Sequence, residues 1–319
     1  MALDYEAMAR DLARALRGSR SQVAFARRLG YRSNAVYTWE SGRRWPPASA
    51  FLAAAHRVGV DVAGGLRTFL RTEPAWLEGD VPAASWVGQL LSDLRGTAPI
   101  GELAARAGRS RFAVSRWLQG RSEPRLPDLL RLVDAASLRG LEFVAVFADP
   151  ASLPSTQAAW AELGAAQALA WSNPWAQAVL LALELVPYRA QPAHDDGWLA
   201  ARLGLPVDVV RQAVALLEQA GQIARDGAHY APVAVRLLDV RRPSASRDLK
   251  RFWAEVALER LVDGAPGAFS YNLVAVSEAD LAALEEMLRA QFRAIRARVA
   301  DSTPAERLAL VQLQLVPLG

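Results

Sequence analysis

Arginine side chains are concentrated in two stretches of the first half of the chain. Residues 17–44 contain seven Arg and one acid, Glu40, while residues 95–125 contain seven Arg and two acids. A guanidinium group forms paired hydrogen bonds with phosphate oxygens and with the edge of guanine. This distribution favours a surface that binds a nucleic acid, whereas the net charge of +4 alone would not indicate that partner.

The chain offers little for catalysis. It has no cysteine, and its three histidines are far apart in the sequence, which argues against disulfides, thiol chemistry and a histidine metal site. It has no nucleophile–base pair, no phosphate-cradling glycine loop and no metal-ligand spacing, so we expect neither an enzyme nor a cofactor. No apolar run is long enough to span a bilayer and no secretory signal opens the chain. We therefore expect a cytoplasmic, nucleoid-associated protein.

The two arginine-rich stretches belong to a tandem repeat. A shift of 78 residues places residues 12–51 on residues 90–129 without a gap. The residues in register include Trp39 with Trp117, Gly30 with Gly108, and Gly42 with Gly120. The first half is therefore predicted to hold two copies of one domain, at 1–70 and 85–148.

Each copy has the pattern of short helices separated by glycine. In the first copy, Ser21 is a suitable N-cap for a helix over 22–29, and a short turn leads to a second helix at about 33–41. In the second copy, Gly108 ends the first helix of the pair and Ser110 caps the next. The residues predicted to face inward in the first copy are Val23, Ala26, Leu29, Val36 and Trp39.

The string SQVAFARRLGYRSNAVYTWESGRRWP at residues 21–46 resembles the Cro/C1 (Xre) family of helix-turn-helix repressors. The resemblance extends over residues 5–145 in two tandem copies. In this geometry one helix lies across the DNA backbone and the next helix enters the major groove. The resemblance implies a transcriptional regulator, a repressor, that binds double-stranded operator DNA as a homodimer.

The resemblance also implies which residues of the first copy contact DNA. The helix opens with Gln22, which would anchor to a phosphate or a base edge. Outward polar residues of the second helix would read bases, with Asn34 able to bond adenine through two hydrogen bonds. The neighbouring arginines would contact phosphates. The predicted contact residues are Gln22, Arg32, Ser33, Asn34, Tyr37, Thr38, Arg43 and Arg44.

The second copy departs from this pattern, because Ile100 replaces Gln22 and Phe112 replaces Asn34. Its arginines could read guanine, and Phe112 could contact a thymine methyl group. The alternative is that this copy has become a dimerisation module. The predicted contact residues are Arg109, Ser110, Arg111, Phe112, Ser115, Arg116 and Arg121.

The second half begins after a Pro- and Ser-rich segment at 149–156, which predicts a linker. Three tryptophans follow, and their spacing favours a helical core, with helices broken at Asn173-Pro174, over a ligand cage. Residues 197–233 have the pattern of a winged helix, with helices at 198–203 and 206–220 and a hairpin turn at Asp226-Gly227. Five acids against three Arg over 195–229 favour a structural or partner-binding role for this region.

The last segment opens with a basic stretch at 241–251, interpreted as a solvated loop or one that lies near DNA. A helix is predicted at 248–261, a strand at 268–276 and a second strand at 308–316. Between the strands, Ser277 and Asp280 form a capping-box pattern that opens a helix to about Val299. Together these elements predict a small sheet. The strings FSYNLVAVSEADL and LVQLQLVPL resemble an uncharacterised bacterial domain of the DUF4423 type, over 160–319. The resemblance implies a winged helix followed by a small α/β unit, without a ligand or activity.

We therefore predict a mainly α fold. It comprises two tandem helix-turn-helix domains, a helical and winged-helix region at 157–240, and a small α/β dimerisation or sensing unit at 241–319. The expected partners are double-stranded DNA, a second copy of the chain, and an effector that is a small molecule, a peptide or a protein. The alternative is an antitoxin-like or effector-gated interaction protein whose second half binds a partner.

Overall fold

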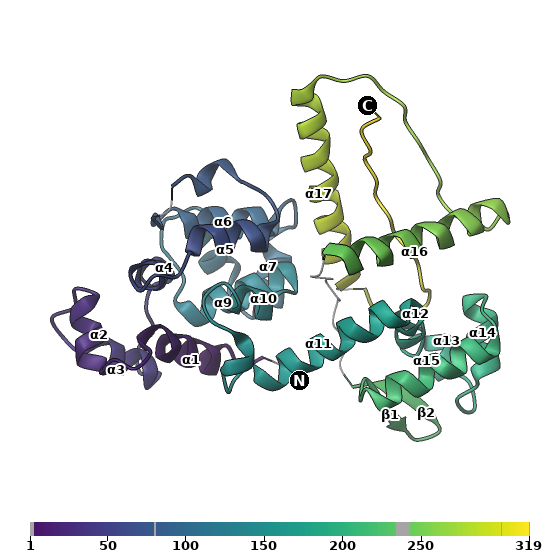
Figure 1. The fold of residues 1–319 in the computed structure, drawn as a ribbon, viewed down its shortest axis with the longest axis horizontal. Helices are drawn as coiled ribbons and strands as arrows, with labels where there is room; N and C mark the ends of the chain where they lie inside the picture. Colours follow the sequence, from purple (N-terminus) through teal and green to yellow (C-terminus); the bar gives the residue numbers. More distant parts are fainter. Residues whose placement is uncertain (1–2, 80, 234–242, 301, 319) are drawn as a thin grey trace. The chain divides into compact units, whose positions relative to one another are not determined.

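A computed structural model describes residues 3–79, 81–233, 243–300 and 302–318 (Figure 1). Over these ranges it contains seventeen α-helices and one two-stranded sheet, which confirms the mainly α class. The chain divides into two compact units, Met1–Ala161 and Glu162–Gly319. None of the helices in the described residues has the length and apolar composition needed to cross a membrane.

The first unit contains the two repeats, and its helices follow the 78-residue period. The first repeat forms α1 (Tyr5–Arg17), α2 (Gln22–Arg28), α3 (Ala35–Glu40), α4 (Ala48–Arg57) and α5 (Val62–Leu70). The second forms α6 (Trp86–Arg95), α7 (Ile100–Arg106), α8 (Arg111–Leu118), α9 (Leu126–Ser137) and α10 (Gly140–Val144). Helices α7, α9 and α10 begin 78 residues after α2, α4 and α5 begin. These three helices therefore keep the same starts in both repeats, although their N-cap residues differ.

The predicted N-caps of α2 and α8 are confirmed, whereas the prediction that Val23 lies in the core is wrong. Ser21 and Ser110 cap α2 and α8, where each hydroxyl accepts a hydrogen bond from a backbone N–H three residues on. Val23, however, is exposed, and α2 buries Phe25 and Ala26 instead. Because these two adjacent residues both point inward, the centre of the buried face lies between them and Val23 turns to solvent.

The two repeats are joined by backbone contacts between equivalent positions. Ala48 N donates to Pro124 O at 3.0 Å, and Leu126 N donates to Pro46 O at 3.0 Å. In the repeat, Ala48 is equivalent to Leu126 and Pro46 to Pro124. This reciprocal exchange is the mark of a local two-fold relation. Below we call this contact the joint; Ser49, which bonds Glu123, lies beside it. Both repeats also contribute to one hydrophobic core.

The predicted linker at 149–156 is part of the first unit. It holds a short 3-10 helix (Pro150–Ser152), and the side chains of Leu153 and Thr156 are buried. Ser155 N donates a hydrogen bond to Asp11 Oδ2 at 2.9 Å. The division between the units falls a few residues later, within α11 (Gln157–Ser172).

The second unit packs helices against a short hairpin. Its elements are α12 (Pro174–Ala182), α13 (Val186–Arg189), α14 (Asp196–Leu203), α15 (Val207–Gln219), β1 (Ile223–Asp226), β2 (His229–Pro232), α16 (Pro243–Val262) and α17 (Glu278–Ala300). Asn173 caps α12, as the Asn-Pro pair predicts. The Trp175 ring meets the rings of Phe252 and Trp253 edge to face, so this tryptophan packs α16 onto the core.

The predicted C-terminal sheet is absent from the described residues. The segments 268–276 and 308–316 are extended but form no strand, and the basic stretch belongs to α16 from Pro243 onward; residues 241 and 242 lie outside the described residues. Alternating polarity predicts an extended backbone, but a strand also requires a partner for its N–H and C=O groups. Neither segment has such a partner among the described residues.

Candidate nucleic-acid interface

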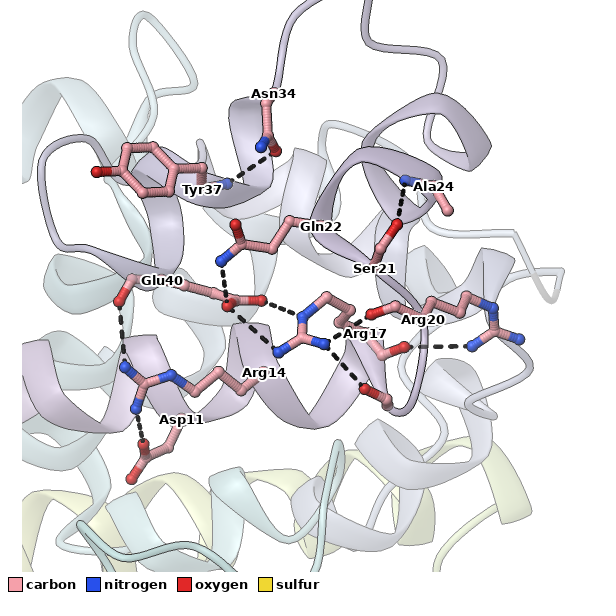
Figure 2. A network of polar contacts seen from close by, with 11 residues as sticks. Asp11, Arg14, Arg17, Arg20, Ser21, Gln22, Ala24, Asn34, Tyr37 and Glu40 are labelled. Carbon is pink, nitrogen blue, oxygen red and sulfur yellow. Dashed lines mark hydrogen bonds and ion pairs between the residues drawn. The ribbon is translucent and has the colours of Figure 1, made fainter.

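A buried carboxylate holds α3 against the two preceding helices (Figure 2). Glu40, the last residue of α3, is 6% exposed. Arg17 of α1 donates to Glu40 Oε1 at 2.5 Å, and Gln22 of α2 donates to Glu40 Oε2 at 2.7 Å. A buried carboxylate is tolerated only where its oxygens accept hydrogen bonds. These contacts therefore fix the orientation of α3.

The same arginine closes the turn between α1 and α2. Arg17 Nη1 donates to the carbonyl oxygens of Gly18, at 3.2 Å, and Arg20, at 2.6 Å. The Arg17 guanidinium is therefore engaged in hydrogen bonds within the first repeat. The other arginines counted between 17 and 44 have exposed side chains: Arg20, Arg27, Arg28, Arg32, Arg43 and Arg44.

Three of the predicted contact residues of the first repeat also make internal hydrogen bonds. Gln22 is bound to Glu40, as above. Asn34 is the N-cap of α3, and its Oδ1 accepts from Tyr37 N at 3.1 Å. The Thr38 hydroxyl donates to Ala35 O at 2.7 Å. These side chains help to form α3, and their capacity to read bases is correspondingly reduced.

The other predicted residues of the first repeat face solvent. Arg32 and Ser33 lie in the turn before α3, and Arg43 and Arg44 follow its end; all four are exposed. Tyr37 is 42% exposed on α3, and the Arg43 guanidinium lies over its ring at 5.4 Å from the centroid. Exposed polar, aromatic and cationic groups thus lie on α3 and at its two ends.

The second repeat presents a related face along α8. Arg111, Arg116 and Arg121 are exposed, and Phe112 is 71% exposed with the Arg116 guanidinium 5.6 Å from its ring centroid. The remaining predicted residues have local partners. Arg109 is paired with Asp128 at 2.6 Å, Ser110 caps α8, and Ser115 accepts a hydrogen bond from Gln119.

The two repeats hold their outward helix by different means. The positions of Glu40 and Gln22 are occupied in the second repeat by Leu118 and Ile100, which are partly buried on the core. An apolar contact thus replaces the carboxylate network. Sequence reasoning missed Glu40, although one signal was present: it is the lone acid of its stretch, and it stands four residues after the inward Val36.

An aromatic pair supports the turn between α2 and α3. The rings of Tyr31 and Trp39 meet edge to face with centroids 5.6 Å apart. Burial raises the pKa of the Tyr31 phenol above its ordinary value, and the nearby Arg57 opposes this shift only in part. The phenol therefore stays neutral near pH 7. The described part of the chain contains no group of three or more His, Asp or Glu side chains that could hold a metal ion.

One family model, described as a domain of unknown function (DUF4423), matches residues 154–318, just over half of the chain. The chain belongs to the DUF4423 family. The DUF4423 match covers the second unit and leaves α1 to α10 outside it, so the family model carries no information on the arginine-rich face. No curated protein and no solved structure matches this DUF4423 protein.

Proposed function

We propose that this chain is a sequence-specific transcriptional regulator that binds double-stranded DNA, and that α3 and α8 are its recognition helices. One observation carries the proposal: each helix buries one side and exposes the other between arginines. Val36 and Trp39 are buried on α3, and Val114 is buried on α8, while the opposite sides are polar, aromatic or cationic. A helix of this kind fits the major groove, and the resemblance to Cro/C1 repressors supports the same role.

The exposed residues divide into two classes. Ser33 and Tyr37 on the first repeat, and Arg111 and Arg116 on the second, stand where base edges would lie; an arginine there suits guanine. Arg43, after the end of α3, suits phosphate and gives affinity rather than sequence preference. Equivalent exposed arginines for phosphate are Arg32, Arg44 and Arg121.

The joint suggests how one chain would meet a duplex. Two repeats that exchange contacts between equivalent residues resemble the two subunits of a symmetric dimer, which reads two half-sites about one helical turn apart. Because the outward residues of α3 and α8 differ, the two half-sites should differ in sequence. In this proposal the second unit serves oligomerisation or effector binding, and the regulator acts as a repressor.

Selection of bound duplexes from a random pool tests the proposal, followed by anisotropy titrations at several salt concentrations. We expect a motif with two unlike half-sites. Arg43→Ala should weaken binding to every sequence and reduce the slope of log K against log salt by about 1. Arg111→Ala should instead relax preference within one half-site by about 1–3 kcal/mol. Arg211→Ala, which removes an exposed arginine from α15, is the matched control and should change neither. A protein without salt-sensitive sequence preference would refute the proposal.

A further inference from the structure

Helix α17 carries an apolar stripe that the described part of the chain does not bury. The stripe residues recur at spacings of three and four, which places them on one side of a helix. They are Leu281, Leu284, Leu288, Phe292, Ile295 and Val299. Phe292 and Val299 are exposed, at 45% and 56%, and the other four are partly exposed. Within the second unit, no other described helix packs along the length of α17 (Figure 1). Part of each of these side chains is therefore open to a partner.

The charges of α17 are separated along its length. Before the midpoint every charged residue is acidic: Glu278, Asp280, Glu285 and Glu286. After the midpoint every charged residue is basic: Arg289, Arg293, Arg296 and Arg298. Several of these charges flank the stripe, where charged residues select the partner and the orientation of paired helices. A helix of this composition is complementary to itself when it is reversed.

We propose that α17 pairs antiparallel with α17 of a second copy of this chain, about a two-fold axis near Leu288. The stripe is symmetric about this residue, since Leu281 and Ile295 stand seven residues on either side of it. The charge also changes sign here, between Glu286 and Arg289. An antiparallel pair sets each acidic half against the partner's basic half. Because the pair has two-fold symmetry, each contact between two residues occurs twice, once in each direction.

A parallel pair of the same helices would place acid against acid and arginine against arginine, which is unfavourable. The ion pairs within α17 do not oppose the antiparallel arrangement. Arg289 with Glu285, at 2.8 Å, is exposed, and Arg293 with Glu286, at 2.7 Å, is partly exposed. Both pairs lie near the centre of the helix, so they contribute little and can be shared with a partner.

The same unit has further apolar surface for a second copy to cover. The extended segments before α17 and after it expose large apolar side chains, among them Tyr271, Leu273, Val316 and Leu318. Exposed apolar surface of this extent is typical of an interaction site. The proposal deepens the oligomerisation part of the proposed function and rests on it there, but it does not depend on DNA reading and is tested without DNA.

Sedimentation of the full chain measures the association, and charge variants test its basis. We expect a dimer. The variant Glu285→Arg with Glu286→Arg makes the middle of α17 basic, and Arg289→Glu with Arg293→Glu makes it acidic. Each variant alone should raise the dimer Kd about ten-fold or more, because like charges then face each other. An equimolar mixture of the two should restore a dimer, now of one copy of each. Glu285, Glu286 and Arg289 are exposed and Arg293 is partly exposed, so circular dichroism should show an unchanged helix content.

Engineered cysteines then test the orientation, and the absence of native cysteine makes each one the only thiol. Leu288→Cys should cross-link to itself through a short thiol reagent. Leu281→Cys should not, because two copies of this residue would lie about 21 Å apart along an antiparallel pair. A mixture of Leu281→Cys and Ile295→Cys should cross-link between the two chains. In a parallel pair, by contrast, Leu281→Cys would cross-link to itself.

Three results would overturn the proposal: a monomer at tens of micromolar protein, a dimer whose Kd neither charge variant changes, or self-linking of Leu281→Cys. None of these bears on DNA reading by α3 and α8. Loss of sequence preference in a chain that still dimerises through α17 would count against the proposed function alone.

Discussion

Removal of the Glu40 carboxylate should loosen α3 while leaving α8 unaffected. Glu40→Ala removes the acceptor of both Arg17 and Gln22. Breaking a buried ion pair by deleting one partner costs about 3–5 kcal/mol. Arg17 is 24% exposed and keeps two carbonyl acceptors, so its guanidinium can be partly rehydrated. We therefore expect a loss of about 2–3 kcal/mol in the local stability of α3.

Hydrogen exchange of the full chain measures this loss where it occurs. A change of about 2–3 kcal/mol corresponds to amide exchange in α3 that is about 30- to 150-fold faster. The amides of α8 are an internal control in the same molecule, because Leu118 stands where α3 has Glu40. The double variant Glu40→Leu with Gln22→Ile copies the second repeat, and its effect should be less than half as large, since an apolar contact replaces the lost pair.

Unchanged exchange in α3 of Glu40→Ala would refute the view that the carboxylate anchors the helix. Equal acceleration in α3 and α8 would refute it as well, because the effect would then be a general loss of stability. The double variant gives a further test. If its α3 amides exchange as fast as those of Glu40→Ala, the apolar pair of the second repeat does not substitute for the carboxylate network.

Three further predictions concern the stability of the first unit, each measured by thermal unfolding and local hydrogen exchange. Gly42→Ala should lower the stability more than Gly120→Ala does. Both residues have positive φ, but an added Cβ at Gly42 would lie 3.3 Å from Arg10 Nη1, whereas Gly120 has open space. If the two variants are equal, the crowding is irrelevant. Asn34→Ala should lower the stability of α3 by about 1 kcal/mol through loss of its cap, and Asn34→Asp should keep most of it; similar losses in both would exclude capping. Tyr5→Phe should cost about 0.5–1.5 kcal/mol, because it removes the 2.7 Å bond to Asp134 that links the two repeats; no change would mean that water replaces it.

Local signals in the sequence predicted most of the helices. The caps at Ser21 and Ser110, the break at Asn173, and the capping bond between Ser277 and Asp280 are all present. Each of these depends on residues within one turn of one another, so neighbouring sequence is enough to specify it. Ser33, Arg43 and Arg116, which the family resemblance and the arginine clustering assigned to the contact surface, are exposed.

Features that depend on distant residues could not be predicted in this way. The segments at 268–276 and 308–316 have the alternation of strands, but pairing is decided by whether another strand lies alongside. Gln22 and Thr38 were assigned to DNA from the family resemblance, and both also donate hydrogen bonds to acceptors inside the unit. The partner of Gln22, Glu40, is eighteen positions away, and its burial depends on the packing of three helices rather than on neighbouring residues.

The joint between the repeats affects how the two repeats can change in sequence during evolution. When two identical polypeptides associate, every substitution occurs in both halves at once, so their binding specificities stay locked together. Here Ala48 meets Pro124 and Leu126 meets Pro46 within one polypeptide, so a single gene encodes each half separately. A substitution can therefore become fixed in one repeat while the equivalent residue of the other repeat stays unchanged. The divergence of Asn34 into Phe112 and of Glu40 into Leu118 is what such independence permits.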